Sequence, residues 1–244
     1  MWRDGWYEFK PHRDDPYLFH LWYMSQDEAD RERIERLRDA GSGAEKRVDP
    51  RPATKHGAGE EWAWYAYLQG EFPGYPERLL SANRSQVQAS IDRMGEEGRN
   101  PEPINEDYLR DRNPAVHRGL LQTTMGAPQP VYYGGLVMAQ VRHFDPERER
   151  PGLPPGTAAL VERVDADGID LTLVNVGGRE REVVVQAGAY GEHEFATVRR
   201  DGEREAQRVD DATISVSLPS GTTLSLSAEM DRFVGDPSYA FPWA

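Results

Sequence analysis

The chain has no cysteine among its 244 residues. Without a thiol it forms no disulfide, binds no metal through thiolates and uses no cysteine nucleophile. It also lacks long hydrophobic runs. No apolar segment approaches the roughly 20 residues needed to cross a bilayer, and the first residues lack the apolar stretch of a signal peptide. These absences favour a cytoplasmic protein, unless Met1 is not the natural start.

Positive charge is scarce as well. The sequence holds 29 lysines and arginines against 42 aspartates and glutamates, so its net charge is −13. This charge repels phosphate backbones and anionic membranes, and we expect neither nucleic acid nor membrane as a partner. No Gly-rich phosphate loop, Gly-x-Ser-x-Gly or His-Glu-x-x-His is present, and we expect no cofactor. His193 lies between Glu192 and Glu194, but neighbouring residues of a strand point to opposite faces and do not share a metal ion.

Helix signals predominate in residues 1–144. Ser25 is followed three residues later by Glu28, which matches a capping box and predicts a helix up to Ala40. The run Trp-Ala-Trp-Tyr-Ala-Tyr-Leu at 62–68 is apolar and aromatic on all sides. This composition predicts a buried helix.

Two further helices are predicted from apolar stripes. The first covers Pro76 to Met94. The second starts at Asn113 and Pro114, a cap followed by a proline in the first helical position, and ends at Gly126. The spacing of the apolar residues predicts buried faces formed by Leu80, Val87, Ile91 and Met94 in the first helix and by Val116, Leu120 and Leu121 in the second.

A proline-rich segment at 145–157 marks a change of period. It contains four prolines and two glycines, which predicts a stiff linker between domains. Beyond it, apolar and polar residues alternate at 169–173, 214–218 and 224–228, as is typical of half-buried antiparallel strands. With regularly spaced turn signals, this pattern predicts a seven-stranded β-sandwich over 158–231. The predicted fold class is α+β, with an N-terminal α-helical hairpin region followed by an antiparallel β-sandwich.

Aromatic residues also occur at two places outside these elements. The C-terminal residues 232–244 are too aromatic for a free tail, and we expect them to form a strap that packs back on the protein. The stretch Gly126–Gly135 breaks the helical pattern and contains Tyr132 and Tyr133. We expect it to form the seam between the domains, with the tyrosines either packing or facing a pocket.

The first candidate site lies at the start of the aromatic helix. Glu60 and Glu61 follow His56 in sequence and precede Trp62. A carboxylate beside tryptophan rings can act as a general acid while the rings stack on a sugar. The alternative is an ordinary helix N-terminus, where the helix dipole favours acidic residues.

The second candidate site lies near the N-terminus. It combines the carboxylates of Asp14 and Asp15 with His20, Trp22 and Tyr23. Such a set suits a carbohydrate cleft, because sugars present apolar ring faces together with hydroxyl groups. The alternative is a turn followed by an amphipathic helix whose aromatic rings belong to the core.

The third candidate site surrounds the predicted seam. Asn113 and His117 lie at the start of a helix, and Tyr132 with Tyr133 lies in the loop that follows it. Together they form a possible polar site at a domain junction, where ligand pockets preferentially occur. The alternative is a helix cap with a packing loop.

Two resemblances to known families bear on function. The residues Gly126, Pro128, Tyr133 and Gly135 echo the Gly-x-Pro-x-x-Tyr-x-Gly-x-Glu segment of alpha-amylase clan glycoside hydrolases, although the spacing differs by one residue and the acid is absent. Helical hairpins followed by an all-β domain are more similar to the end of an (α/α)-barrel glycoside hydrolase or polysaccharide lyase. The segment 113–154 also resembles uncharacterised bacterial proteins of this layout.

The resemblance implies our first functional hypothesis, that the chain is part or a relative of a carbohydrate-active enzyme of glycoside hydrolase or polysaccharide lyase type. The alternative is a non-catalytic module that binds a glycan or a protein, with a structural β-sandwich. A carboxylate pair about 5–10 Å apart across an open cleft favours hydrolysis, whereas buried or scattered carboxylates favour binding. The residues assigned by the first hypothesis are Glu60 or Glu61 as acid, Asp14 or Asp15 as its partner, Trp22, Trp62 and Tyr133 as stacking surface, and His56 and His117 as further substrate contacts.

Overall fold

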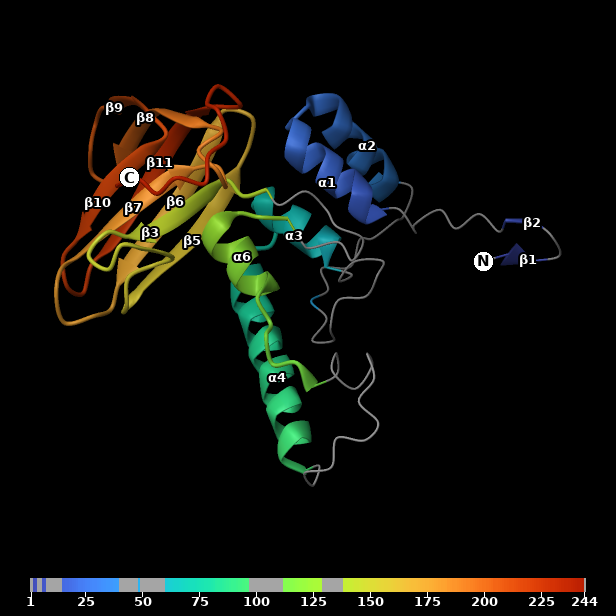
Figure 1. Ribbon diagram of the computed structural model, residues 1–244. Helices are drawn as coiled ribbons and strands as arrows, with labels where there is room; N and C mark the ends of the chain where they lie inside the picture. The colour runs from blue at the N-terminus through green and yellow to red at the C-terminus, as the bar shows by residue number, and fades with distance from the viewer. Residues whose placement is uncertain are drawn as a thin grey trace. The chain divides into compact units, whose positions relative to one another are not determined.

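The computed structural model describes residues 2–3, 6–7, 15–39, 48, 60–96, 112–128 and 138–243. The chain forms two compact units, which we treat separately. The helical unit contains helices α1 to α4, and the sandwich unit contains helix α6 with strands β3 to β11 (Figure 1). The predicted α+β fold class is confirmed: helices come first, and two antiparallel sheets of four and five strands follow.

The described elements of the helical unit are a short strand pair and four helices. Their bounds are β1 Trp2–Arg3, β2 Trp6–Tyr7, α1 Asp15–Ser25, α2 Glu28–Asp39, α3 Glu61–Leu68 and α4 Tyr75–Glu96. Helix α2 is capped by Asp27, whose carboxylate accepts a hydrogen bond from the Ala29 amide at 2.7 Å. The predicted cap, Ser25, instead accepts from the Asp27 amide and donates to Asp30. Both serine and aspartate are common N-cap residues. Because Asp30 is buried and needs a hydrogen-bond donor, Ser25 donates to it, and Asp27 serves as the cap.

Helix α3 has the predicted character. Its residues are buried, except for the half-buried Trp62. Gly70 follows the helix with a φ of 75°, a left-handed conformation that glycine adopts without strain.

Helix α4 has nearly the predicted bounds, but the predicted buried face is wrong. Ile91 and Met94 each expose 46% of their surface, and Leu80 is exposed as well. The buried positions lie about one residue earlier, which is a rotation of about 100° around the helix. They include Leu79, Asn83 and Ser90. Periodicity identified an apolar stripe, but packing buried a different, partly polar one.

Helix α6, Arg118–Met125, begins later than predicted, because Asn113 and Pro114 precede it without helical structure. Its buried positions include small or polar residues such as Gly119 and Thr123, whereas the predicted core residue Leu120 is 55% exposed. The helix packs on strands β5 and β3 of the sandwich. Its end is as predicted: Gly126 has a φ of 63°, and its amide donates to the Gln122 carbonyl.

In the described part of the chain, nine strands form the two sheets of the sandwich unit. The four-stranded sheet has the order β10-β7-β3-β4, and the five-stranded sheet has the order β5-β6-β11-β8-β9. All pairings are antiparallel. The bounds are β3 Val141–Asp145, β4 Arg150–Pro151, β5 Thr157–Val164, β6 Gly168–Asn175, β7 Arg181–Ala187, β8 Glu194–Arg200, β9 Gln207–Asp211, β10 Thr213–Leu218 and β11 Thr223–Asp231.

The three alternating segments found in the sequence are strands β6, β10 and β11. In β6, Leu171 and Leu173 are buried while Thr172 between them is only partly covered. In β11, Leu226 and Ala228 are buried and pair with β6 in register, Leu226 opposite Leu171. The side-chain period of two therefore assigned the buried faces of these strands correctly.

The proline-rich segment 145–157 differs from the expected linker. Strand β3 ends at Asp145, pairs with β7 and with β4, and so belongs to the sandwich before the prolines begin. Pro151 lies in β4, the edge strand of its sheet, where a residue without an amide hydrogen is tolerated. The prolines shape a turn and a sheet edge within one unit.

Candidate functional site

The acidic pair at the start of α3 is inside the helical unit. Glu60 has no exposed surface and Glu61 exposes 6%. The Glu60 carbonyl accepts a hydrogen bond from the Trp64 amide at 2.9 Å, which places Glu60 at the helix cap. A buried carboxylate requires partners, and neither residue is without one. This burial matches the arrangement that favours a structural role for the pair.

The tryptophans proposed to stack on a sugar belong to an aromatic cluster of α1 and α3. Trp22 is 3% exposed and lies edge-on to Tyr65, with ring centroids 5.1 Å apart. Phe19 packs against both Trp62 and Tyr65, at 4.9 and 5.5 Å. The Tyr65 hydroxyl donates to Glu35 at 2.5 Å, and burial together with this bond raises the pKa of Tyr65. Trp22 therefore offers no ring face to a ligand, and only Trp62 is partly accessible.

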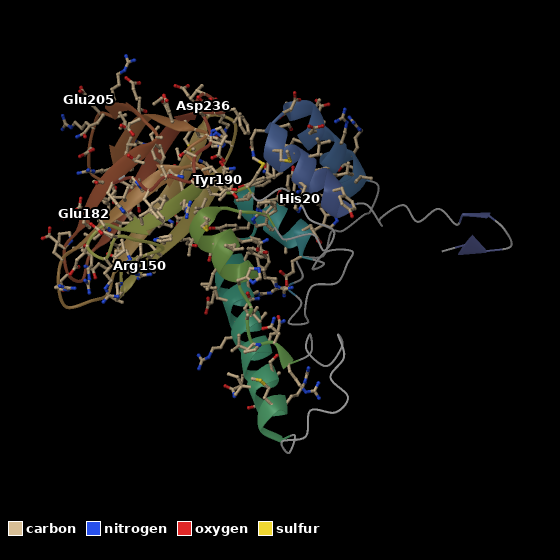
Figure 2. The ribbon with its side chains drawn as sticks, in the orientation of Figure 1. His20, Arg150, Glu182, Tyr190, Glu205 and Asp236 are labelled. Carbon is tan, nitrogen blue, oxygen red and sulfur yellow. The ribbon has the colours of Figure 1, made fainter. Side chains whose placement is uncertain are left out.

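The remaining predicted site residues are not brought together by the described part of the chain. Asp14, His56 and Tyr133 lie outside the described residues, and only the backbone of Asp15 is described, within α1. His117 is exposed just before α6 and makes no side-chain cap. His20, labelled in Figure 2, lies in α1, is half-buried and has a partner.

A second aromatic group lies at the C-terminus of the chain, where the sequence predicts a strap. We call residues 232–243 the C-terminal strap. The rings of Phe241 and Trp243 each lie edge-on to Phe144 of β3, at 6.1 and 5.7 Å. Tyr239 lies against Tyr190 at 5.1 Å. The strap therefore covers part of the four-stranded sheet.

Arg232 fixes the beginning of the strap, and sequence reasoning missed it. Its guanidinium donates to the Gln140 side chain at 2.6 Å and to the carbonyls of Asp165 and Ala166 at 2.5 and 3.2 Å. Further along, the Ser238 amide donates to the Tyr190 carbonyl at 2.8 Å. In the sequence, the only indication of this role was the position of the arginine, directly after a predicted strand and before an aromatic tail.

The loop beneath the strap is held by a buried glutamate. Glu192 accepts hydrogen bonds from the amides of Ala189 and Tyr190, at 3.1 and 2.7 Å. Gly188 makes room for it, because a Cβ at that position would lie 2.4 Å from a Glu192 carboxylate oxygen. Glu192, one of the two acidic residues beside His193, thus has a structural role, because its carboxylate holds the loop through backbone hydrogen bonds. Among the residues that the structure describes, no group of side chains suits a metal ion.

Two histidines are buried in the sandwich unit. His143 of β3 donates through Nε2 to the Thr124 carbonyl of α6 at 2.6 Å, and burial lowers its pKa to about 4. His193 accepts through Nδ1 from the Phe233 amide at 3.0 Å, and its ring lies edge-on to the Phe233 ring. Burial lowers the pKa of His193 too, with Glu192 opposing the shift. Both rings are therefore neutral at neutral pH, and each joins two segments of the sandwich unit through a hydrogen bond.

Although aromatic rings gather in both units, their exposure differs. Tyr239 exposes 82% of its surface, Phe241 40% and Trp243 36%. The planes of Phe241 and Trp243 are 10° apart with centroids at 5.3 Å, so the ring surface that they expose has nearly one orientation. In Figure 2, Tyr190 and Asp236 mark the region over which the strap runs. These rings form the candidate binding surface of the sandwich unit.

Comparison with known proteins reaches only the N-terminal half. Residues 1–121 match the model of a domain of unknown function (DUF8034). No curated protein matches the chain. The match covers little of the segment 113–154 for which a resemblance was expected, and it points to no carbohydrate-active family. The described helices form no closed barrel, contrary to the expected likeness to an (α/α)-barrel. No helix among the described residues is long and apolar enough to span a membrane.

Proposed function

We propose that the protein is a non-catalytic glycan-binding protein, and that the C-terminal strap forms part of its binding surface. One observation carries the proposal: Tyr239, Phe241 and Trp243 expose aromatic surface from a segment fixed to a sheet. Exposed aromatic groups on a soluble protein often mark interaction sites. A sugar suits them, because its apolar ring face stacks on the aromatic ring while its hydroxyls remain hydrated.

The charge of the protein narrows the ligand class. The net charge is −13, and the strap itself contains Asp236. A glycan that carries carboxylates or sulfates would be repelled at long range. The proposed ligand is therefore a neutral polysaccharide.

Affinity gel electrophoresis in the presence of soluble neutral polysaccharides tests the proposal. Starch, xylan, β-glucan and galactomannan are used as probes. We expect at least one to retard the protein, and we expect the double variant Tyr239→Ala/Trp243→Ala to bind it about tenfold more weakly, which corresponds to the loss of about 1.4 kcal/mol. The matched control is Val176→Ala, which removes an apolar side chain that is 78% exposed in the turn after β6.

Two results would overturn the strap as the binding surface. The first is that none of the four polysaccharides retards the protein. The second is that the double variant, folded with an unchanged circular dichroism spectrum, is retarded as strongly as the parent.

A carbohydrate-active enzyme is the second candidate function. Its support is the pair of carboxylates Glu60 and Glu61, which directly precede Trp62 in sequence at the start of α3. Carboxylates near aromatic rings are the groups that glycoside hydrolysis uses. Release of reducing ends or unsaturated products from the bound polysaccharide, lost in Glu60→Gln, Glu61→Gln or Asp15→Asn, would support it. Binding without any cleavage would leave the non-catalytic function.

A further inference from the structure

A polar hollow lies on the five-stranded sheet. Its volume is about 300 Å³. The strands β6, β11 and β8 form its floor, and the turn after β8 closes one side. The side chains used in the argument below are Glu162, Asp170, Arg199, Asp201 and Ser225. The volume is at the lower end of the range of ligand pockets, about 300–1,000 Å³.

A chain of hydroxyl groups runs across the hollow in one direction. The Thr172 hydroxyl donates to Glu162 at 3.1 Å, and it lies 3.1 Å from the Ser225 hydroxyl. Because a hydroxyl has a single hydrogen, Thr172 must accept from Ser225. The Ser225 oxygen then keeps lone pairs that accept a hydrogen bond from a ligand hydroxyl.

The charged side chains of the hollow differ in the partners that they have within the protein. Asp170 accepts two hydrogen bonds from Arg163, at 2.7 and 3.2 Å. Arg199 acts on the same carboxylate: burial opposes the change, but hydrogen bonds from Arg163 and Ser227 and the charges of Arg163 and Arg199 lower the pKa of Asp170. Asp201 is exposed and lines the hollow. Ser227, opposite Arg199 in the β11–β8 register, brings the guanidinium and the serine row together. The hollow thus offers guanidinium donors from Arg199 and acceptors from Asp201 and Ser225.

We propose that this hollow binds a single neutral sugar ring or a similar polyol. Each hydroxyl of a sugar both donates and accepts, so neighbouring hydroxyls match the donors of Arg199 and the acceptors of Ser225 and Asp201. An anionic ligand fits less well, because four carboxylates and two guanidiniums line the hollow. The inference adds a site to the proposed function, but it does not depend on the strap.

Amide NMR spectra of the ¹⁵N-labelled full chain test the inference, with D-glucose, D-galactose and D-mannose as probes. We expect saturable shifts of the Gly202, Ser225 and Ser227 amides for at least one sugar, with a Kd of about 1 mM. Arg199→Ala should weaken the binding about tenfold, and Ser225→Ala should weaken it about fivefold while Ser225→Thr restores it. Arg148→Ala, which removes an exposed arginine from the turn between β3 and β4, is the control and should leave the Kd unchanged.

Several outcomes overturn the inference. One is the absence of saturable shifts near the hollow for all three sugars. Another is an unchanged Kd in Arg199→Ala, provided that the β3 amides keep their positions and so report an intact fold. A third is saturation by sodium glucuronate at lower concentration than by glucose, which would make the ligand an anion. By contrast, sugar-induced amide shifts that persist in Tyr239→Ala/Trp243→Ala would support the inference. They would show that the hollow binds sugar independently of the strap, even if the parent protein binds no polysaccharide.

Discussion

The two units of the molecule bury different chemistry. The helical unit buries aromatic rings, such as those of Trp22 and Tyr65, and also buries the carboxylates of Glu60 and Asp30. The sandwich unit has an aliphatic interior of valines and leucines, such as Val183 of β7, into which polar residues enter singly. Several of these buried polar side chains have a structural partner, for example the carbonyl of Thr124 for His143.

This difference teaches where function is to be sought. In the helical unit, the aromatic and acidic residues that resemble a sugar site are used for packing. In the sandwich unit, aliphatic side chains form the core, while the aromatic rings of the strap are partly exposed and the polar hollow is accessible at the surface. Residue types that suit carbohydrate chemistry occur in both units, but accessibility differs.

The largest expected effect comes from the ring beneath the strap. Phe144→Ala removes a fully buried side chain that contacts Phe241 and Trp243, and it should lower the free energy of unfolding of the sandwich unit by about 3–5 kcal/mol. Urea unfolding followed by hydrogen exchange of the β7 amides measures the change. A loss below 1 kcal/mol would mean that the strap and this sheet are not one packed structure.

Acid should destabilise the sandwich unit through its buried histidines. The pKa of His143 is about 4 in the folded protein and about 6.5 in the unfolded chain, so between these values only the unfolded chain binds the proton. Above pH 6.5 the His143 ring is neutral in both states and does not lower the free energy of unfolding. As the pH drops to 4, protonation of the unfolded chain lowers this free energy by about 3 kcal/mol. The unfolding free energy of His143→Gln, which keeps a donor for the Thr124 carbonyl, should lose this part of the slope. Parallel slopes for parent and variant would contradict the assignment.

The end of α6 tests how closely the helix approaches the sheet. In Gly126→Ala, a side chain must adopt a φ of 63°, and its Cβ would lie 3.1 Å from both Gln140 and Val161. We expect a loss of about 2 kcal/mol in thermal unfolding. Gly70→Ala is the matched control, because its φ is 75° but no atom lies within 4 Å of the added Cβ. It should cost about 1 kcal/mol, and equal losses would remove the role assigned to close packing.

The smallest effect is expected in the helical unit. Tyr65→Phe removes the hydrogen bond to Glu35 but leaves the ring packing, and it should cost about 1 kcal/mol. Tryptophan fluorescence during urea unfolding measures it. The control is Arg36→Ala, which breaks an exposed ion pair with Glu32 at 3.6 Å and should cost under about 0.5 kcal/mol. If both variants lose the same small amount, the polar contacts of this unit add little to its aromatic packing.

The candidate sites show the limit of sequence reasoning most clearly. Residue types near Glu60 and Trp62 suit both a sugar cleft and a helix start, and sequence spacing does not distinguish exposed from buried groups. The hollow gave no signal at all, because Arg199 and Ser225 lie 26 positions apart in the sequence and meet only through strand pairing.

The sequence by itself determined the fold class, the buried aromatic helix, the alternating strands and the helix end at Gly126. These depend on local periods and on backbone preferences, which a short segment carries on its own. The tertiary structure alone decided which stripe of α4 is buried, that β3 belongs to the sandwich, and that the strap rings stay accessible while Trp22 does not. Burial and strand pairing depend on partners distant in the chain, and no local pattern specifies them.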